Sequence, residues 1–276
     1  MKYKVTMGIV LSVLLVGILS LAFNVQPAKA SETIYIRADG TVEPLTANIT
    51  SADNATYYFT GNNYDQIVVN RSDIIIDGNG HTLQGSGEGN GFTLEYVNNV
   101  TIKNMEIKVF DYGIWLNMSS GNTISDNNIT NNSDGIVLND SSNNTISGNK
   151  ISANNWHGIV LYSSSNNTFY HNKFIGNTQH ANIQTSSVAN FWNSSYPSGG
   201  NYWSNYTDVD QYSGSYQNET GSDGYWDHPY EIDDYNIDHY PIVPEFLSWT
   251  TMLLTLVVLT VAMAICKRRL FKTPIH

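Results

Sequence analysis

The sequence predicts an all-β protein built as a right-handed parallel β-helix, a solenoid whose coils are 22 to 23 residues long. Two landmarks repeat with this period: a Thr followed by Ile or Phe, and a Gly followed by Ile or Phe. A fixed period of about 20 to 50 residues is typical of solenoids, in which each repeat buries its apolar face only by stacking on its neighbours. The landmarks begin at Thr101, Thr123, Thr145 and Thr168, and at Gly91, Gly113, Gly135 and Gly158.

Apolar residues recur in columns and tend to alternate with polar residues inside each repeat. Ile124 is followed by Ser125, and Ile136 and Leu138 lie two residues apart. A period of two is the strand signature, because successive side chains of a strand point to opposite faces. The repeats therefore predict short strands with a shared core. Its columns are Ile102, Ile124, Ile146 and Phe169; Ile107, Ile129, Ile151 and Phe174; Ile114, Ile136 and Ile159; and Leu116, Leu138 and Leu161.

Asparagine also falls in columns. Stacked strands lie about 4.8 Å apart, so identical amides can hydrogen-bond from coil to coil. The alternative is that Asn is present only because it tolerates turn dihedrals. The two columns are Asn127, Asn149 and Asn172, and Asn122, Asn144, Asn167 and Asn190.

The repeats carry a family resemblance. The segment 73–84, DIIIDGNGHTLQ, and the repeated NNTISGNKI and GIVL units are similar to the NosD-type β-helix family. That family belongs to a larger set named for carbohydrate-binding proteins and sugar hydrolases. The stretches 200–205 and 221–241 extend the resemblance to roughly residues 33 to 243. The resemblance implies the β-helix fold, and the family's association with copper-centre maturation implies copper as a candidate metal.

The ends of the chain predict export and anchoring. Residues 1–30 have a basic start, an apolar stretch and an Ala-x-Ala site at 28–30, as a cleaved secretory signal does; an uncleaved anchor is the alternative. Residues 244–266 predict a transmembrane helix, and the basic tail 267–276 predicts a cytoplasmic end. The Pro-Glu-Phe run at 244–246 also resembles the PEF type of archaeal C-terminal sorting signal, and the alternative that this resemblance implies is a tail that is removed and replaced by another anchor.

Between these ends we expect one elongated domain outside the cell. Residues 31–72 would form the N-terminal cap and first coils, 73–190 the regular β-helix, and 191–243 an aromatic and acidic C-terminal cap. The whole chain has a formal net charge of −11, and no Lys or Arg lies between Lys173 and Lys267. Nucleic-acid binding relies on Lys and Arg and is excluded as a function on this ground. Thirteen Asn-x-Ser/Thr sequons make the domain a candidate glycoprotein.

The aromatic residues of the cap have two interpretations. A solenoid end exposes an open core and needs a cover. Aromatic rings also supply flat apolar faces on which sugars stack. The candidate sugar-binding residues are Trp203, Tyr206 and Trp226.

Two groups of residues are candidate metal ligands. Carboxylates on turns suit Ca²⁺, and Asp208, Asp210, Asp223 and Asp227 are the candidates; the alternative is a solvated acidic surface. In the aligned repeats, Asp134 and His157 precede the Gly landmark, and His180 precedes Ala181 in the next repeat. His157 and His180 would then lie one coil apart and, with Asp134, could hold copper. The alternative is that these are chance turn histidines.

Together these features favour a cell-surface, membrane-anchored β-helix with a binding or structural role, whose partners are glycans or other cell-envelope components. One alternative is a carbohydrate-active enzyme, a polysaccharide lyase or hydrolase. The Asn-Thr-Asp and Gly-His-Gly signatures of polygalacturonases are absent, and no catalytic residue is assigned. The other alternative is a copper-handling accessory protein.

Overall fold

The computed structural model describes residues 32–184 and 189–244, and these residues form strands and turns with no helix. The all-β prediction is confirmed for this part of the chain. The predicted signal at 1–30 lies outside the described residues, as does the predicted membrane helix except for Pro244. Within the described ranges we find no helix with the length and apolar character that a bilayer span requires.

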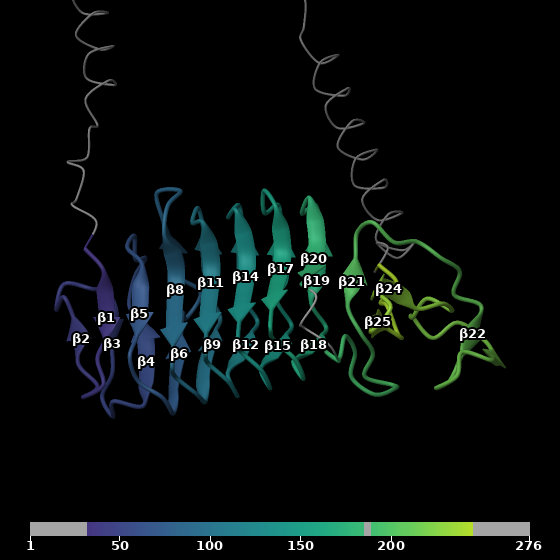
Figure 1. Ribbon diagram of the computed structural model, residues 1–276, viewed down its shortest axis with the longest axis horizontal. Helices are drawn as coiled ribbons and strands as arrows, with labels where there is room; N and C mark the ends of the chain where they lie inside the picture. The colour runs from purple at the N-terminus through teal and green to yellow at the C-terminus, as the bar shows by residue number, and fades with distance from the viewer. Residues whose placement is uncertain (1–31, 185–188, 245–276) are drawn as a thin grey trace, which may run out of the picture.

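Three sheets run side by side along the solenoid, with the N-terminal coils at one end and the C-terminal cap at the other (Figure 1). Apart from short antiparallel pairs at the N-terminal end, neighbouring strands in each sheet are parallel and come from successive coils. The first sheet has the order β2-β1-β5-β8-β11-β14-β17-β20. Its strands are β1 (Ile34–Ile36), β2 (Val42–Glu43), β5 (Ile67–Val69), β8 (Asn90–Glu95), β11 (Tyr112–Asn117), β14 (Asp134–Asn139), β17 (His157–Tyr162) and β20 (Gln179–Ile183).

The other two sheets consist mainly of three-residue and four-residue strands. The second sheet contains β3 (Ile49–Thr50), β4 (Thr56–Phe59), β6 (Ile74–Asp77), β9 (Val100–Lys103), β12 (Thr123–Ser125), β15 (Thr145–Ser147) and β18 (Thr168–Tyr170). The third contains β7 (Thr82–Gln84), β10 (Glu106–Lys108), β13 (Asn128–Thr130), β16 (Lys150–Ser152), β19 (Lys173–Ile175) and β21 (Tyr202–Trp203). Two hairpins follow in the cap: β22 (Tyr212–Ser213) with β23 (Glu219–Thr220), and β24 (Tyr230–Asp233) with β25 (Asn236–Asp238).

The predicted core columns are columns of strand register. Ile124 pairs with Ile102 on one side and Ile146 on the other, and Ile136 pairs with Ile114 and Ile159. All six side chains are fully buried. The alternation predicted from the letters therefore sets which face of each strand lies inside.

The two predicted asparagine ladders are confirmed. Asn127 donates from its amide nitrogen to Asn149 Oδ1 at 3.1 Å, and Asn149 donates in the same way to Asn172 at 3.0 Å. A third ladder that the sequence analysis missed joins Asn132, Asn154 and Asn177. Each ladder amide also accepts a backbone N–H from the previous coil, so the buried corners of the solenoid are hydrogen-bonded along its length.

The residue before a ladder position has a positive φ. Asp126, Gly148 and His171 precede the ladder residues Asn127, Asn149 and Asn172, with φ values of 55°, 68° and 55°. A left-handed residue turns the chain sharply, and Asn, Asp and Gly adopt it at lowest cost. This corner geometry explains why Asn, Asp and Gly gather between the strands.

The repeated glycine follows from close approach of the backbone. A Cβ atom added to Gly135 would lie 2.4 Å from the carbonyl oxygen of Gly158 in the next coil, and one on Gly158 would lie 2.5 Å from that of His180. Only glycine fits this position between two stacked coils. In the last coil the position is taken by His180, which has no further repeat of this kind above it.

The cap closes the open end of the core with indole rings. Trp192 stacks on Phe169 with ring centroids 4.2 Å apart, and Trp203 stacks on Phe174 at 4.3 Å. Tyr230 stacks on the other face of Trp203 at 4.4 Å. The prediction that the aromatic segment covers the end of the solenoid agrees with this packing.

Candidate functional site

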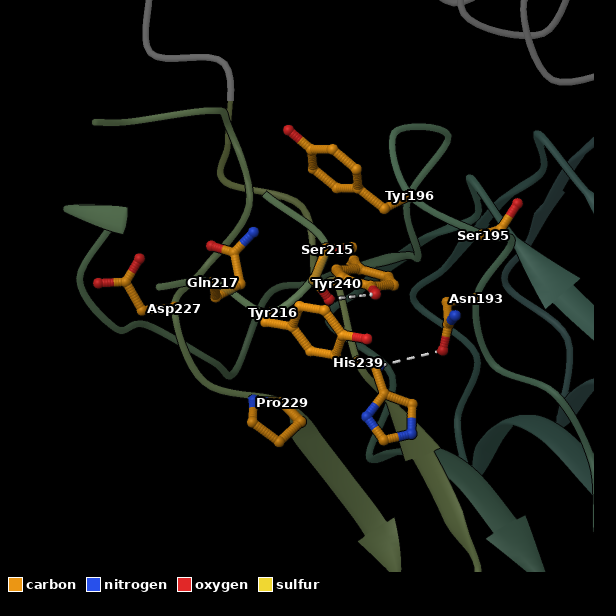
Figure 2. A pocket seen from close by; sticks show the side chains of 10 residues that line it. All are labelled: Asn193, Ser195, Tyr196, Ser215, Tyr216, Gln217, Asp227, Pro229, His239 and Tyr240. Carbon is orange, nitrogen blue, oxygen red and sulfur yellow. Dashed lines mark hydrogen bonds between the residues drawn. The ribbon is translucent and has the colours of Figure 1, made fainter. Parts of the chain in front are cut away.

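The cap carries an open pocket of about 530 Å³ that we call the cap pocket (Figure 2). Four segments that are separate in the sequence meet there: the stretch after Trp192, the β22–β23 turn, the chain before β24 and the chain after β25. The lining residues are Asn193, Ser195, Tyr196, Ser215, Tyr216, Gln217, Asp227, Pro229, His239 and Tyr240.

The rings of Tyr196, Tyr216 and Tyr240 line the cap pocket, and they differ in how far they are exposed to solvent. Tyr240 donates its hydroxyl to the carbonyl of Ser215 at 2.9 Å, and its ring lies 5.9 Å from that of Tyr196 (Figure 2). Tyr216 has 84% of its surface exposed. The pocket thus has a fixed aromatic wall and one ring that is open to a ligand.

The polar groups of the cap pocket are oriented by the backbone. Asp227 accepts the backbone N–H groups of Gln211 and Tyr212 at 3.0 to 3.1 Å, and Asn193 accepts the N–H of His239 at 3.1 Å. Gln217 donates its amide to Gly214 and Asp223, while its Oε1 atom is buried and receives no hydrogen bond from the described residues. These hydrogen bonds hold the side chains of Asp227, Asn193 and Gln217 in place at the wall of the cap pocket.

The structure contradicts part of the sugar-binding prediction. Trp203 is 2% exposed and Trp226 is 8% exposed, so neither indole offers a face to solvent. Tyr206 is half-buried and lies beside the backbone carbonyls of His228 and Pro229, to which its hydroxyl donates. These residues build the cap, and the tyrosines of the cap pocket offer the open aromatic surface. Aromatic content alone pointed to the segment, but the sequence carries no sign of which rings are buried.

The four acidic residues predicted for Ca²⁺ each organise a turn of their own. Asp210 accepts from Ser222, Asp223 and Gly224, and Asp223 accepts from Gln217 and Tyr225. Asp208 accepts the backbone and ring nitrogens of His228, and Asp227 accepts two backbone amides. Burial is the largest single influence on the pKa of Asp208 and raises it. The hydrogen bonds and charge of His228, together with a backbone hydrogen bond from Val209, outweigh burial, so the pKa lies below its usual value. The carboxylates therefore serve as loop acceptors and do not converge.

The predicted histidine column has the wrong register. His157 pairs with Gln179, and Ile159 pairs with Ala181, so His180 stands beside Gly158. The side chain of His180 is buried beside the stacked rings of Phe174 and Trp203, next to Asn177 and Ser204, and burial lowers its pKa. Ala181 is small like the Gly landmark, but it pairs with Ile159 and so stands one residue beyond the position next to Gly158.

Asp134 and His157 do lie together, on the outward side of the first sheet. Asp134 Oδ1 is 2.7 Å from His157 Nδ1, and Asn182 Nδ2 is 3.0 Å from His157 Nε2. Gln184 donates to Asn182 Oδ1, which leaves the Asn182 amide nitrogen to donate to the imidazole. Both ring nitrogens of His157 therefore have hydrogen-bond partners.

Comparisons with known proteins give one family and a few solved structures. The family model described as "Periplasmic copper-binding protein (NosD)" matches residues 24–208. No curated protein matches. A mutant of the periplasmic alginate epimerase AlgG is similar, with 23% identity over 58% of this chain and 39% of that one and a TM-score of 0.43. The A-module of the Azotobacter vinelandii mannuronan C-5 epimerase AlgE6 gives 17% identity, 50% and 48% coverage and a TM-score of 0.35.

The family description names copper, and the described residues do not fit a copper centre. No group of three or more His, Cys, Asp or Glu in residues 32–184 and 189–244 is arranged to hold a metal ion. His157 already uses both ring nitrogens, and His180 faces the core. We therefore derive no chemistry through copper.

Proposed function

The chain belongs to the NosD family, and from this premise we propose that it is a saccharide-binding β-helix protein that acts outside the cytoplasm. The observation that carries the proposal is the cap pocket, where three tyrosine rings stand beside polar side chains that the backbone holds in place. The solenoid acts as a rigid support that fixes one end of the cap.

The chemistry of the cap pocket suits a sugar unit. Binding sites of this kind combine apolar or aromatic walls with a few placed polar groups, and tyrosine offers a flat apolar face with a polar handle. Asp227 would accept a hydrogen bond from one sugar hydroxyl, and Asn193 Oδ1 would accept one from another. No Lys or Arg is among the lining residues, so nothing there favours an anionic group over a neutral one.

The family and the predicted ends of the chain support a proposed location at the cell surface. The family is described as periplasmic. With the signal at 1–30 removed and the segment 244–266 in the membrane, the solenoid would stand on the outer surface with its cap next to the anchor. Its partners there would be glycans or other cell-envelope components.

The test is binding of a glycan array by the full chain in detergent, followed by calorimetry with the best ligand. We expect Tyr216→Ala to weaken binding about tenfold, because loss of one stacking ring removes on the order of 1 kcal/mol. Tyr235→Ala is the matched control, since Tyr235 is 73% exposed in the turn between β24 and β25 and does not line the pocket. A chain that binds no glycan, or binding that both variants weaken equally, would contradict the proposal.

A further inference from the structure

The outward face of the first sheet is broader than the other two faces of the solenoid. From β8 to β17 its strands have six residues, whereas the matching strands of the third sheet have three (Figure 1). Its outward residues form columns about 4.8 Å apart from coil to coil. A ligand lying along the solenoid axis would meet the same column in each coil.

Two valines on this face are covered although they point outward. Val137 and Val160 flank the buried core residues Ile136 and Ile159 by alternation and lie outside the core cluster. They are nevertheless only 3% and 1% exposed. Large side chains of neighbouring columns must therefore lie over them.

Aromatic residues stand in the same column as these valines and in the columns on either side. Trp115 is the register neighbour of Val137 in the previous coil, and Tyr112 and Tyr162 stand in the columns on either side. Burial raises the pKa of Tyr112, and the charge of Asp134, its register neighbour in the next coil, raises it further. Tyr162 remains 43% exposed. The register thus places one tryptophan and two tyrosines in columns around Val137 and Val160, and Tyr162 is open to solvent.

Hydrogen-bonding side chains with fixed orientations stand in rows on both sides of these aromatic residues. The imidazole of His157 is fixed between Asp134 and Asn182. On the other side Asn139 donates to Asn117 at 2.7 Å, and Asn117 donates to Glu95 at 2.9 Å. These groups are held in place by their neighbours before any ligand arrives, which reduces the entropy that binding would lose.

The charge of the face selects the ligand. Strands β8, β11, β14, β17 and β20 contain no Lys or Arg, and their ionisable carboxylates are Glu95 and Asp134. An acidic polymer would be repelled, and a neutral one would find aromatic faces and amides. We propose that the outward face of β11, β14 and β17 is a second binding site, for a neutral polysaccharide chain that lies along the solenoid. This site goes beyond the cap pocket, which takes a sugar unit at the end of the molecule.

The experiment is native affinity electrophoresis of the full chain in non-ionic detergent, in gels that contain laminarin, galactomannan, dextran or soluble starch. Gels with polygalacturonate or alginate form the acidic arm. We expect retardation by at least one neutral polymer and a loss of about tenfold in affinity for Tyr162→Ala. Tyr58→Ala is the matched control, because Tyr58 is 47% exposed on the second sheet.

Three outcomes would overturn the proposal: no retardation by any of the four neutral polymers, preferential retardation by the acidic ones, or equal effects of Tyr162→Ala and Tyr58→Ala. Tyr162→Phe keeps the ring and should keep the binding, which guards against a variant that merely fails to fold. Tyr216→Ala separates the two sites. If the cap pocket alone binds glycans, Tyr216→Ala abolishes retardation and Tyr162→Ala does not.

Discussion

Asp238 accepts the indole N–H of Trp203 on its Oδ2 atom at 2.9 Å, and this contact fastens the last hairpin to the ring that closes the core. The same oxygen accepts the backbone N–H of Asn201 at 2.7 Å, and Oδ1 accepts that of Tyr240 at 3.1 Å. Asp238 is fully buried. A Cβ atom on Gly200 would lie 1.8 Å from its Oδ1, so a glycine is needed beside it.

Asp238 predicts a specific dependence of stability on pH. Burial raises its pKa from 3.8 to about 7, against the lowering by Trp203 and Asn201. The folded state then binds more protons than the unfolded state between about pH 4 and pH 7, so this group's contribution to the free energy of unfolding falls as pH rises through that window and is constant above it. The change is on the order of 4 kcal/mol.

Asp238→Asn removes the titrating group. Urea unfolding of both proteins from pH 4 to pH 8 should show that the wild type loses stability relative to the variant as pH rises to about 7. Taking the difference removes the contribution of other carboxylates, such as Asp77, whose lowered pKa gives the opposite slope. A difference between the two proteins that does not change with pH would contradict the prediction.

The asparagine ladders predict a large loss of stability on truncation. Asn149 Oδ1 accepts two hydrogen bonds from Asn127, and its amide nitrogen donates to Asn172 and to the carbonyl of Ile124. Asn149→Ala leaves these buried groups unpaired, and we expect a loss of about 3 to 5 kcal/mol in the free energy of unfolding. Lys150→Ala, one residue on and exposed, should change it by less than about 0.5 kcal/mol. Similar effects in urea unfolding would show that the ladder contributes little.

The regular coils could be predicted from the letters because each residue of a solenoid stacks on its counterpart in the next coil. Residues separated by one sequence period are therefore paired in neighbouring strands, as Ile102, Ile124 and Ile146 are. The third ladder of Asn132, Asn154 and Asn177 follows the same spacing and was open to the same reasoning. The period also predicted the glycine column, but only the structure shows that glycine is required there because the backbone of the next coil lies too close for a Cβ atom.

Where the period stops, this reasoning fails. At the last coil the glycine is replaced, and the position next to Gly158 is His180 instead of Ala181. The cap has no repeat, so its contacts join residues far apart, such as Trp203 and Asp238. Sequence alone therefore could not separate the buried indoles from the exposed ring of Tyr216.

The alternation within a strand predicts opposite outcomes for neighbouring substitutions. Ile146 is fully buried in the core, whereas Ser147 points outward and is partly exposed. Ile146→Asp places an unpaired charge in the stack and should prevent folding or cost more than about 4 kcal/mol. Ser147→Asp should cost less than about 1 kcal/mol. Thermal unfolding followed by circular dichroism measures both, and equal losses would mean that the face assignment of β15 is wrong.

The acidic turns of the cap give the last prediction, which concerns metal removal. Asp210 and Asp223 already accept hydrogen bonds from backbone amides and side chains on the turn that connects them. Because these oxygens are satisfied by the chain itself, the cap should fold without Ca²⁺. A ligand that binds only the folded state raises the melting temperature, so we expect the same Tm in excess EDTA and in saturating Ca²⁺. Asp210→Asn should lower Tm equally under both conditions, because it weakens the turn and not a metal site. A fall in Tm on adding EDTA that Asp210→Asn abolishes would instead establish Ca²⁺ as part of the cap.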